Sequence, residues 1–213
     1  MRKIILHAFL LLFPILFQAQ TKSEIKPKYI IGLNAILNYS DIYGKNQMAK
    51  DFGATLNYSA GISFEYKFNK NWSLLTNINY DRKFTEYDFE GNILQSSYKS
   101  ELNLEYISVP ILAKYFFPNT FIYATGGIYY SKLLQAKNYN DGVLNDIDFK
   151  DVFEKDDFGV VTGIGLQFYE NEKETNAMNI ELRNNFGLKD IGGYFTGIKT
   201  NSLYLMLNYT IEL

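Results

Sequence analysis

The chain of 213 residues contains no cysteine, and its single histidine, His7, lies near the start. Without cysteine there are no disulfides, thiolate nucleophiles, cysteine-ligated zinc sites, iron–sulfur clusters or N-terminal lipid anchors. Without a second histidine, Ser-His-Asp, Cys-His and Asp-His mechanisms and histidine-ligated zinc sites are also excluded beyond residue 7. We therefore expect that the protein is not an enzyme and carries no cofactor.

Net charge and long apolar runs are also scarce. The formal charge of −2 argues against a nucleic-acid partner. The mean hydropathy of −0.17 is close to neutral, and after residue 20 no segment holds ~18 consecutive apolar residues. The sequence therefore predicts no transmembrane helix beyond its first twenty residues.

Residues 1–20 have the order of a secretory signal peptide. Arg2 and Lys3 precede an apolar run over 4–17, and Ala19 supplies a small residue for cleavage. An uncleaved N-terminal anchor is the alternative, but the run is short for a spanning helix. Cleavage would leave 19 basic and 23 acidic residues, a short N-terminal segment at 21–28 and one domain at 29–213.

Aromatic residues are abundant, with 18 Tyr and 17 Phe, and these residue types favour strands. From residue 29 onward, apolar and polar residues alternate, as they do on the two faces of a strand. In the clearest segment, 56–68, apolar side chains alternate with small, polar or charged ones. Ile62 and Ser63 are neighbours on opposite faces in this segment.

Eight such segments are present, and their connections alternate between short and long. The expected strands are 29–39, 56–68, 72–83, 101–115, 120–136, 158–168, 178–183 and 203–213. The short connections are 69–71, 117–119 and 170–176, and the long ones are 40–55, 88–96, 137–156 and 189–200. Aromatic residues flank the short connections. This pattern predicts an all-β, eight-stranded, antiparallel up-and-down barrel that crosses an outer membrane.

Two strands resist a simple assignment. In 101–115 the apolar face changes phase near Pro110, and a β-bulge there would produce a shift of one residue. In 120–136 paired glycines and tyrosines obscure the alternation, so the facing of this strand stays open.

The polar strand faces carry charges of both signs, which we expect to pair inside a narrow lumen because buried charges need partners. The expected ionic network comprises Glu65, Lys67, Asp81, Lys83, Glu101, Glu105, Lys114, Glu181, Arg183 and Glu212. A catalytic carboxylate pair is the alternative. Glu101 and Glu105 would lie ~13 Å apart along one strand, too far for a glycosidase pair.

Six acidic or amide residues in the 137–156 connection could gather around calcium: Asn138, Asn140, Asp141, Asp146, Asp148 and Asp151. Their spacing fits no EF-hand loop, so a solvated polar loop is the simpler interpretation.

Several segments resemble the PorT-like outer-membrane β-barrel family of Bacteroidota, a group of Gram-negative bacteria. Leu104–Tyr115 (LEYISVPILAKY) is similar to its YI-x-x-P-x-L-x-K-Y stretch, Tyr123–Ser131 to its Gly-Gly strand, Asp157–Leu166 to its DFG-x-x-x-GIG segment and Asn179–Leu188 to its ELR-x-x-x-GL segment. The resemblance implies an outer-membrane barrel. It implies no single activity, although the family's namesake is linked to protein secretion.

Three functional interpretations stay open. The first is a structural, anchoring or interaction protein, with outer-membrane lipid, the barrel-assembly machinery and proteins at the long connections as partners. The second is a soluble periplasmic barrel that binds ligands as lipocalins do, with its apolar face inside. The third is a narrow pore, although the side chains of eight strands nearly fill the interior of their barrel.

Overall fold

The computed structural model describes residues 28–45, 53–89, 98–144, 149–169, 175–193 and 197–213. The expected signal peptide at 1–20 lies outside these ranges. Within them, no helix has the length and apolar character needed to cross a membrane.

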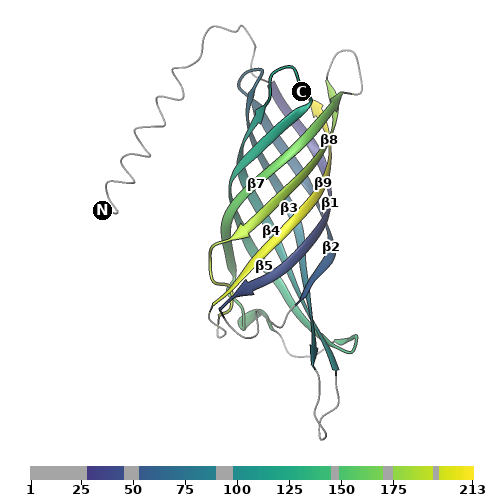
Figure 1. Cartoon of the computed structure of the whole chain (residues 1–213), viewed down its shortest axis with the longest axis vertical. Helices are drawn as coiled ribbons and strands as arrows, with labels where there is room; N and C mark the ends of the chain where they lie inside the picture. The colour runs from purple at the N-terminus through teal and green to yellow at the C-terminus, as the bar shows by residue number, and fades with distance from the viewer. Residues whose placement is uncertain (1–27, 46–52, 90–97, 145–148, 170–174, 194–196) are drawn as a thin grey trace, which may run out of the picture.

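Eight long antiparallel strands form a closed barrel (Figure 1). Neighbouring strands follow the chain order, and pairing of β4 with β5 closes the ring. The strands are β1 (Lys28–Gly44), β2 (Gly53–Lys67), β3 (Trp72–Phe89), β4 (Tyr98–Phe116), β5 (Ile122–Asn140), β7 (Asp156–Tyr169), β8 (Asn176–Gly187) and β9 (Ile198–Glu212). A two-residue strand, β6 (Val143–Leu144), pairs with the end of β5, and a 3₁₀ turn, η1 (Phe149–Asp151), follows it. The predicted fold class is confirmed.

The alternation in the sequence decides which side chains face inward. Ile62 is exposed on the outer surface, whereas its neighbour Ser63 is buried in the interior and hydrogen-bonds to Asn208 of β9, over the intervening strand β1. Large apolar side chains are exposed on every barrel strand, while most buried polar side chains lie inside. The barrel is therefore apolar outside and polar inside over most of its length.

An outer apolar belt extends from the short-turn end to a ring of polar residues. Trp72, Phe121 and Phe168 are exposed at the short-turn end. About eleven residues farther along β3, β4 and β5, the outer face carries Arg82, Glu105 and Lys132. A barrel strand crosses a bilayer in about 9–11 residues, so the belt has the height of a membrane.

Beyond that ring, β3, β4 and β5 continue past the belt (Figure 1). The apolar face of β4 changes phase in the sequence because the strand passes from lipid to water at this boundary. Even-numbered residues of β4 face inward from Leu102 through Leu112 to Lys114, so the bulge predicted at Pro110 is wrong. On the short-turn side of the boundary, the apolar residues of β4 face lipid. On the long-loop side they face the interior, away from water.

The register shift lies on β5 instead. Glu105 pairs with Gln135 while Tyr106 pairs with Leu133, so Leu134 is the extra residue. This bulge shows which residues of β5 face inward, a question that the sequence left open. Tyr123, Ser131 and Leu133 face inward before it, and Ala136 faces inward after it.

Three of the predicted long connections are shorter than expected. β1 continues to Gly44 and β2 begins at Gly53, β5 continues to Asn140, and β9 begins at Ile198. The polar residues at these positions belong to strands that have left the apolar belt, where an outward polar side chain faces water.

Candidate functional site

The barrel interior holds most of the charged residues that the sequence singled out. Glu65, Asp81, Lys83, Lys114, Glu181 and Arg183 are buried inside, and Lys67 and Glu212 lie at the short-turn mouth. Glu101 and Glu105 do not join them. They alternate with Leu102, Leu104 and Tyr106, which face the interior, so both glutamates lie on the outer side of β4. Glu105 accepts a hydrogen bond from the outward Tyr80 hydroxyl at 2.6 Å.

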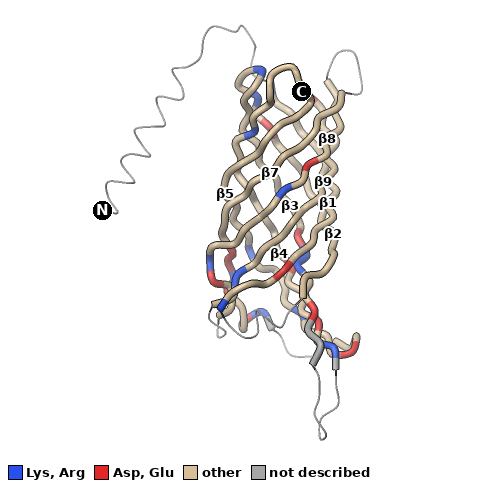
Figure 2. The backbone as a smooth tube through the Cα atoms, viewed as in Figure 1, with Lys and Arg blue, Asp and Glu red and all other residues tan. Residues whose placement is uncertain are grey.

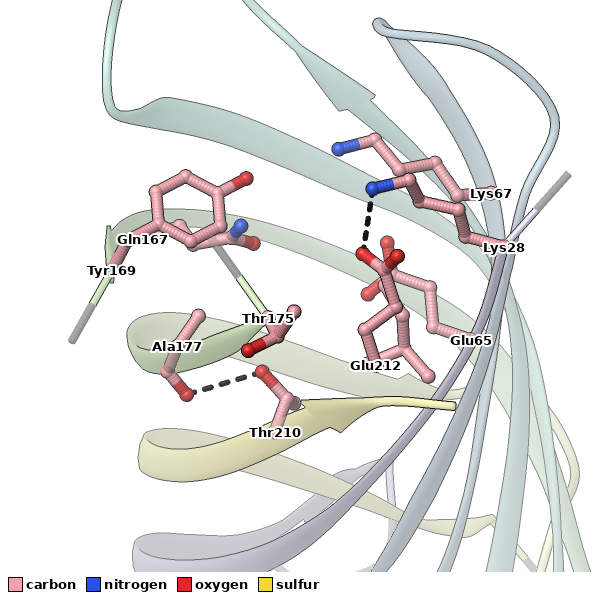
Figure 3. A pocket seen from close by; sticks show the side chains of 10 residues that line it. Lys28, Glu65, Lys67, Gln167, Tyr169, Thr175, Ala177, Thr210 and Glu212 are labelled. Atoms are coloured by element: carbon pink, nitrogen blue, oxygen red, sulfur yellow. Dashed lines mark hydrogen bonds and ion pairs between the residues drawn. The ribbon is translucent and has the colours of Figure 1, made fainter. Parts of the chain in front are cut away.

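The first layer of the interior lies near the short turns. The Lys114 ammonium is 2.9 Å from the Glu65 carboxylate and donates to the Gln167 side-chain oxygen at 3.3 Å. Lys28 and Glu212 form a second, part-exposed pair at 2.8 Å, at the mouth itself (Figure 3). Lys114 on β4 thereby bonds to β2 and β7, each two strands away around the barrel, whereas Lys28 and Glu212 lie on the neighbouring strands β1 and β9.

A second layer crosses the middle of the belt. The Arg183 guanidinium binds the Glu181 carboxylate through two nitrogens, at 2.8 and 3.0 Å, and donates to the Asn77 side chain at 2.9 Å. Tyr123 and Thr125 donate their hydroxyl protons to the same carboxylate, at 3.1 and 2.6 Å. The buried charges are thus neutralised and bonded to both walls of the lumen.

A third layer lies at the level of the outer polar ring. The Lys83 ammonium is 2.9 Å from the Asp157 carboxylate, which also accepts from the Thr200 and Tyr129 hydroxyls, at 2.7 and 3.1 Å. Sequence reasoning missed Asp157 and the inward tyrosines. Alternation could have identified Asp157 as inward, because it precedes the outward Phe158. No such signal exists for the tyrosines, since a tyrosine fits either face of a barrel strand.

Beyond the third layer, toward the long-loop end, the interior becomes apolar. A cluster of buried residues, here called the apolar plug, closes the long-loop end. It contains Ile42, Leu102, Leu104, Tyr106, Leu133, Ala136, Phe153, Ile191 and Ile198. Phe153 and Ile191 come from two connections that fold over the mouth, and the other members come from strands. Figure 2 shows charged residues gathered around this end of the barrel.

Backbone and side-chain bonds hold the two connections together. The Glu154 N–H donates to the Ile191 carbonyl at 2.9 Å, and the Lys189 ammonium lies 3.3 Å from the Glu154 carboxylate. Gly193 has a φ of +53°. A Cβ added to it would lie 2.2 Å from the Val152 carbonyl oxygen, so only glycine permits this approach.

Asp190 fixes the base of the second connection. Its carboxylate accepts from the backbone N–H groups of Gly192 at 2.9 Å and Ile198 at 3.1 Å, and also from Gly197. Burial alone would raise the pKa of Asp190, but the three backbone donors outweigh burial and lower this pKa below its usual value.

The described residues contain no group of three or more His, Cys, Asp or Glu side chains that could hold a metal ion. Of the residues considered for calcium, Asp146 and Asp148 lie outside the described ranges. Asp141 instead accepts a hydrogen bond from the Lys99 N–H, at 2.9 Å, and fixes the β5–β6 turn.

A closed antiparallel barrel with an apolar outer belt, aromatic residues at one rim and a filled polar lumen defines a small transmembrane barrel. A family model described as an outer membrane protein beta-barrel domain matches residues 18–193. The chain therefore belongs to this family, and its location is the outer membrane.

Solved structures agree on the fold. Neisserial surface protein A is 15% identical, with 89% of this chain and 100% of that chain covered and a TM-score of 0.50. Outer Membrane Protein W of E. coli is 11% identical, with 90% and 100% covered and a TM-score of 0.51. None of the curated proteins matches the chain. The lipocalin-like interpretation required an apolar interior throughout, and the apolar outer belt contradicts it.

Proposed function

We propose that the protein is a closed, non-enzymatic barrel that anchors in the outer membrane and presents its long-loop end to a partner. The apolar plug carries this proposal. It fills the lumen where a solute would have to pass, and its members Phe153 and Ile191 belong to the connections themselves. A general channel keeps this region open and wet.

The surface beyond the belt supports an interaction role. β3, β4, β5 and β6 extend past the outer polar ring as one sheet, and its last strand exposes Val143 and Leu144. Unpaired strand edges with exposed apolar side chains favour protein partners. The resemblance to PorT-like barrels supports a narrower version, in which the partner belongs to a protein-secretion system.

Conductance in planar bilayers tests the closed-barrel part. The purified mature protein should give no large, stable current. A reproducible porin-like state in the unmodified protein would contradict the proposal and make solute passage the leading function.

Photo-crosslinking in intact cells tests the interaction part. A photoreactive residue at Val143 should give a discrete crosslinked product, because this side chain is exposed beyond the membrane. The matched control is the same residue at Lys70, which is exposed at a short turn on the opposite side of the membrane. Identical products from both positions, or none from Val143, would count against a partner at the long-loop end.

A further inference from the structure

Two hollows lie on the outer wall of the barrel, one after the other along β1. The first, of about 340 Å³, is lined by Ala35 and Leu37 of β1 and by Tyr58 of β2, among others. The second, of about 450 Å³, is lined by Leu33 and Ile31, farther toward the short-turn end. Together the two hollows are here called the β1 groove. Its outward side chains are apolar or aromatic and lie within the belt, so the groove faces lipid.

Small side chains form the hollow nearer the long-loop end. Ala35 and Ala60 are directly opposite each other on β1 and β2, and both are exposed on the outer wall. Leu37, Tyr58 and Leu207 are their larger, exposed neighbours. Association within lipid depends on close packing, because lipid tails are as apolar as leucine. A depression of alanines between larger side chains therefore gives an acyl chain more contact than a flat wall does.

The groove has the length of one acyl chain. From Ile31 to Leu37 the distance along β1 is ~20 Å, at ~3.3 Å per residue. One leaflet of the hydrocarbon core is ~15 Å thick, and a strand tilted by ~45° crosses that thickness in ~21 Å. A single extended chain that lies along β1 therefore fits the groove from end to end.

A cation lies at the long-loop end of the groove. The Arg82 guanidinium donates to the Tyr58 hydroxyl at 2.7 Å and lies 5.0 Å from the centre of the Tyr58 ring. Arg82 is opposite Glu105 in the sheet, yet the Glu105 carboxylate binds the Tyr80 hydroxyl instead. Among the described residues no carboxylate lies within ion-pair distance of Arg82. The guanidinium is therefore turned away from β4, toward β2 and the groove.

We propose that the β1 groove binds one anionic phospholipid of the outer leaflet, with an acyl chain along β1 and the phosphate on Arg82. Arg82 belongs to the outer polar ring, and the long loops of an up-and-down barrel face the cell exterior, so this ring lies at the level of the outer head groups. Arginine is well suited to phosphate because its N–H groups match the phosphate oxygens. An apolar partner would satisfy the hollows alone, whereas a phospholipid satisfies the hollows and the cation together.

Amide and methyl shifts of the full mature protein in lipid nanodiscs test the proposal. The nanodiscs contain phosphatidylcholine, which is replaced stepwise by phosphatidylglycerol with the same acyl chains. We expect saturable shifts at Ala35, Leu37 and Arg82 that follow the anionic lipid, and the lipid fraction at the half-maximal shift measures the affinity. Glycerol phosphate, which carries the charge without the chain, should produce no shift.

Two outcomes of this titration would overturn the proposal. Spectra that do not change as phosphatidylglycerol replaces phosphatidylcholine would show only non-selective contact with lipid. Shifts at Ala35 and Leu37 that depend on the number of barrels in each nanodisc, and not on the lipid, would assign the groove to a second copy of the chain.

A first pair of variants tests the head group. Arg82→Gln should weaken the affinity for phosphatidylglycerol at least about five-fold, because a charge-assisted hydrogen bond is lost. Its control is Lys132→Gln, which removes a lysine of the same polar ring that already pairs with Asp156, and which should leave the affinity unchanged.

A second pair tests the acyl chain. Ala35→Leu fills the hollow beside Arg82 without changing the charge, and should weaken the affinity by a similar factor. Ala113→Leu enlarges an exposed alanine on the outer wall of β4, outside the groove, and should have no effect. All four variants should keep the heat-modifiable mobility of a folded barrel. Equal effects of the two members of either pair would overturn the proposal.

Discussion

Along its axis the barrel has two parts, one surrounded by lipid within the apolar belt and one surrounded by water beyond it, and the two parts need opposite distributions of polar and apolar residues. Inside the belt, Ile111 faces lipid and Lys114 faces the lumen. Beyond it, Glu101 lies outside and Leu104 is buried in the interior, on the same strand. The facing of β4 does not change between them, because its even-numbered residues point inward throughout. The solvent around it changes from lipid to water, so one β4 strand carries two opposite patterns.

The largest effect is expected from removing one partner of a buried ion pair in the part of the lumen that the belt surrounds. Arg183→Ala should destabilise the barrel by about 3–5 kcal/mol, because Glu181 would remain buried and unpaired. Equilibrium unfolding in urea, in lipid or detergent, measures the loss. The double variant Glu181→Leu with Arg183→Met should recover much of it. Equal stability of Arg183→Ala and the parent would contradict the ion-paired lumen.

Beyond the belt, the interior depends on apolar packing instead. Leu104→Ala should cost about 2–5 kcal/mol, since Leu104 is fully buried in the apolar plug. Its control is Leu104→Met, which conserves volume and should cost less than about 1.5 kcal/mol. The same unfolding measurement applies. A loss that is no larger for Ala than for Met would show that the plug is not tightly packed.

The outer surface gives the third comparison. Ile62→Arg places a charge on the lipid-facing side of β2 and should cost about 2–4 kcal/mol or block assembly. Val143→Arg places the same charge on an exposed side chain beyond the belt and should change stability by less than about 0.5 kcal/mol. Ser63→Arg, which points into the lumen, should act through the interior. If the Ile62 and Ser63 variants were both harmless, the facing of β2 would be wrong.

The smallest expected effect is a pH-dependent loosening of the backbone around Asp190, beyond the belt. The folded pKa of Asp190 is lowered, so its contribution to stability is present above the usual aspartate pKa and is lost as pH falls through the folded pKa. The backbone amides of Gly192 and Ile198 should lose protection against hydrogen exchange at that low pH. Asp190→Asn should lack this transition. Protection that is unchanged on acidification would remove Asp190 from the base of this connection.

Much of the fold could be predicted because alternation in a lipid-facing strand is unambiguous. Strands such as 56–68 carry apolar residues on one face and polar residues on the other, and their number and order follow from that pattern. The strand extensions could not be predicted, because beyond the membrane Asp41 and Asn140 face water and read as loop residues.

The interior was predicted in its composition but not in its geometry. Alternation placed Lys114 and Arg183 inside, yet the partner across the lumen depends on barrel closure, which brings residues distant in sequence together. Glu65 therefore meets Lys114 from β4. Glu101 and Glu105 were misplaced because the sequence alone does not show where the membrane ends.

The position of that boundary on β4 is the most direct test of the whole account. Because the chain has no cysteine, single cysteines at Glu101, Glu105, Ile111 and Ala113 can carry a nitroxide label in lipid vesicles. Oxygen should relax the labels at 111 and 113 more strongly than a water-soluble nickel complex, and the nickel complex should dominate at 101 and 105. Equal accessibility to both reagents at all four positions would contradict a change of solvent along this strand.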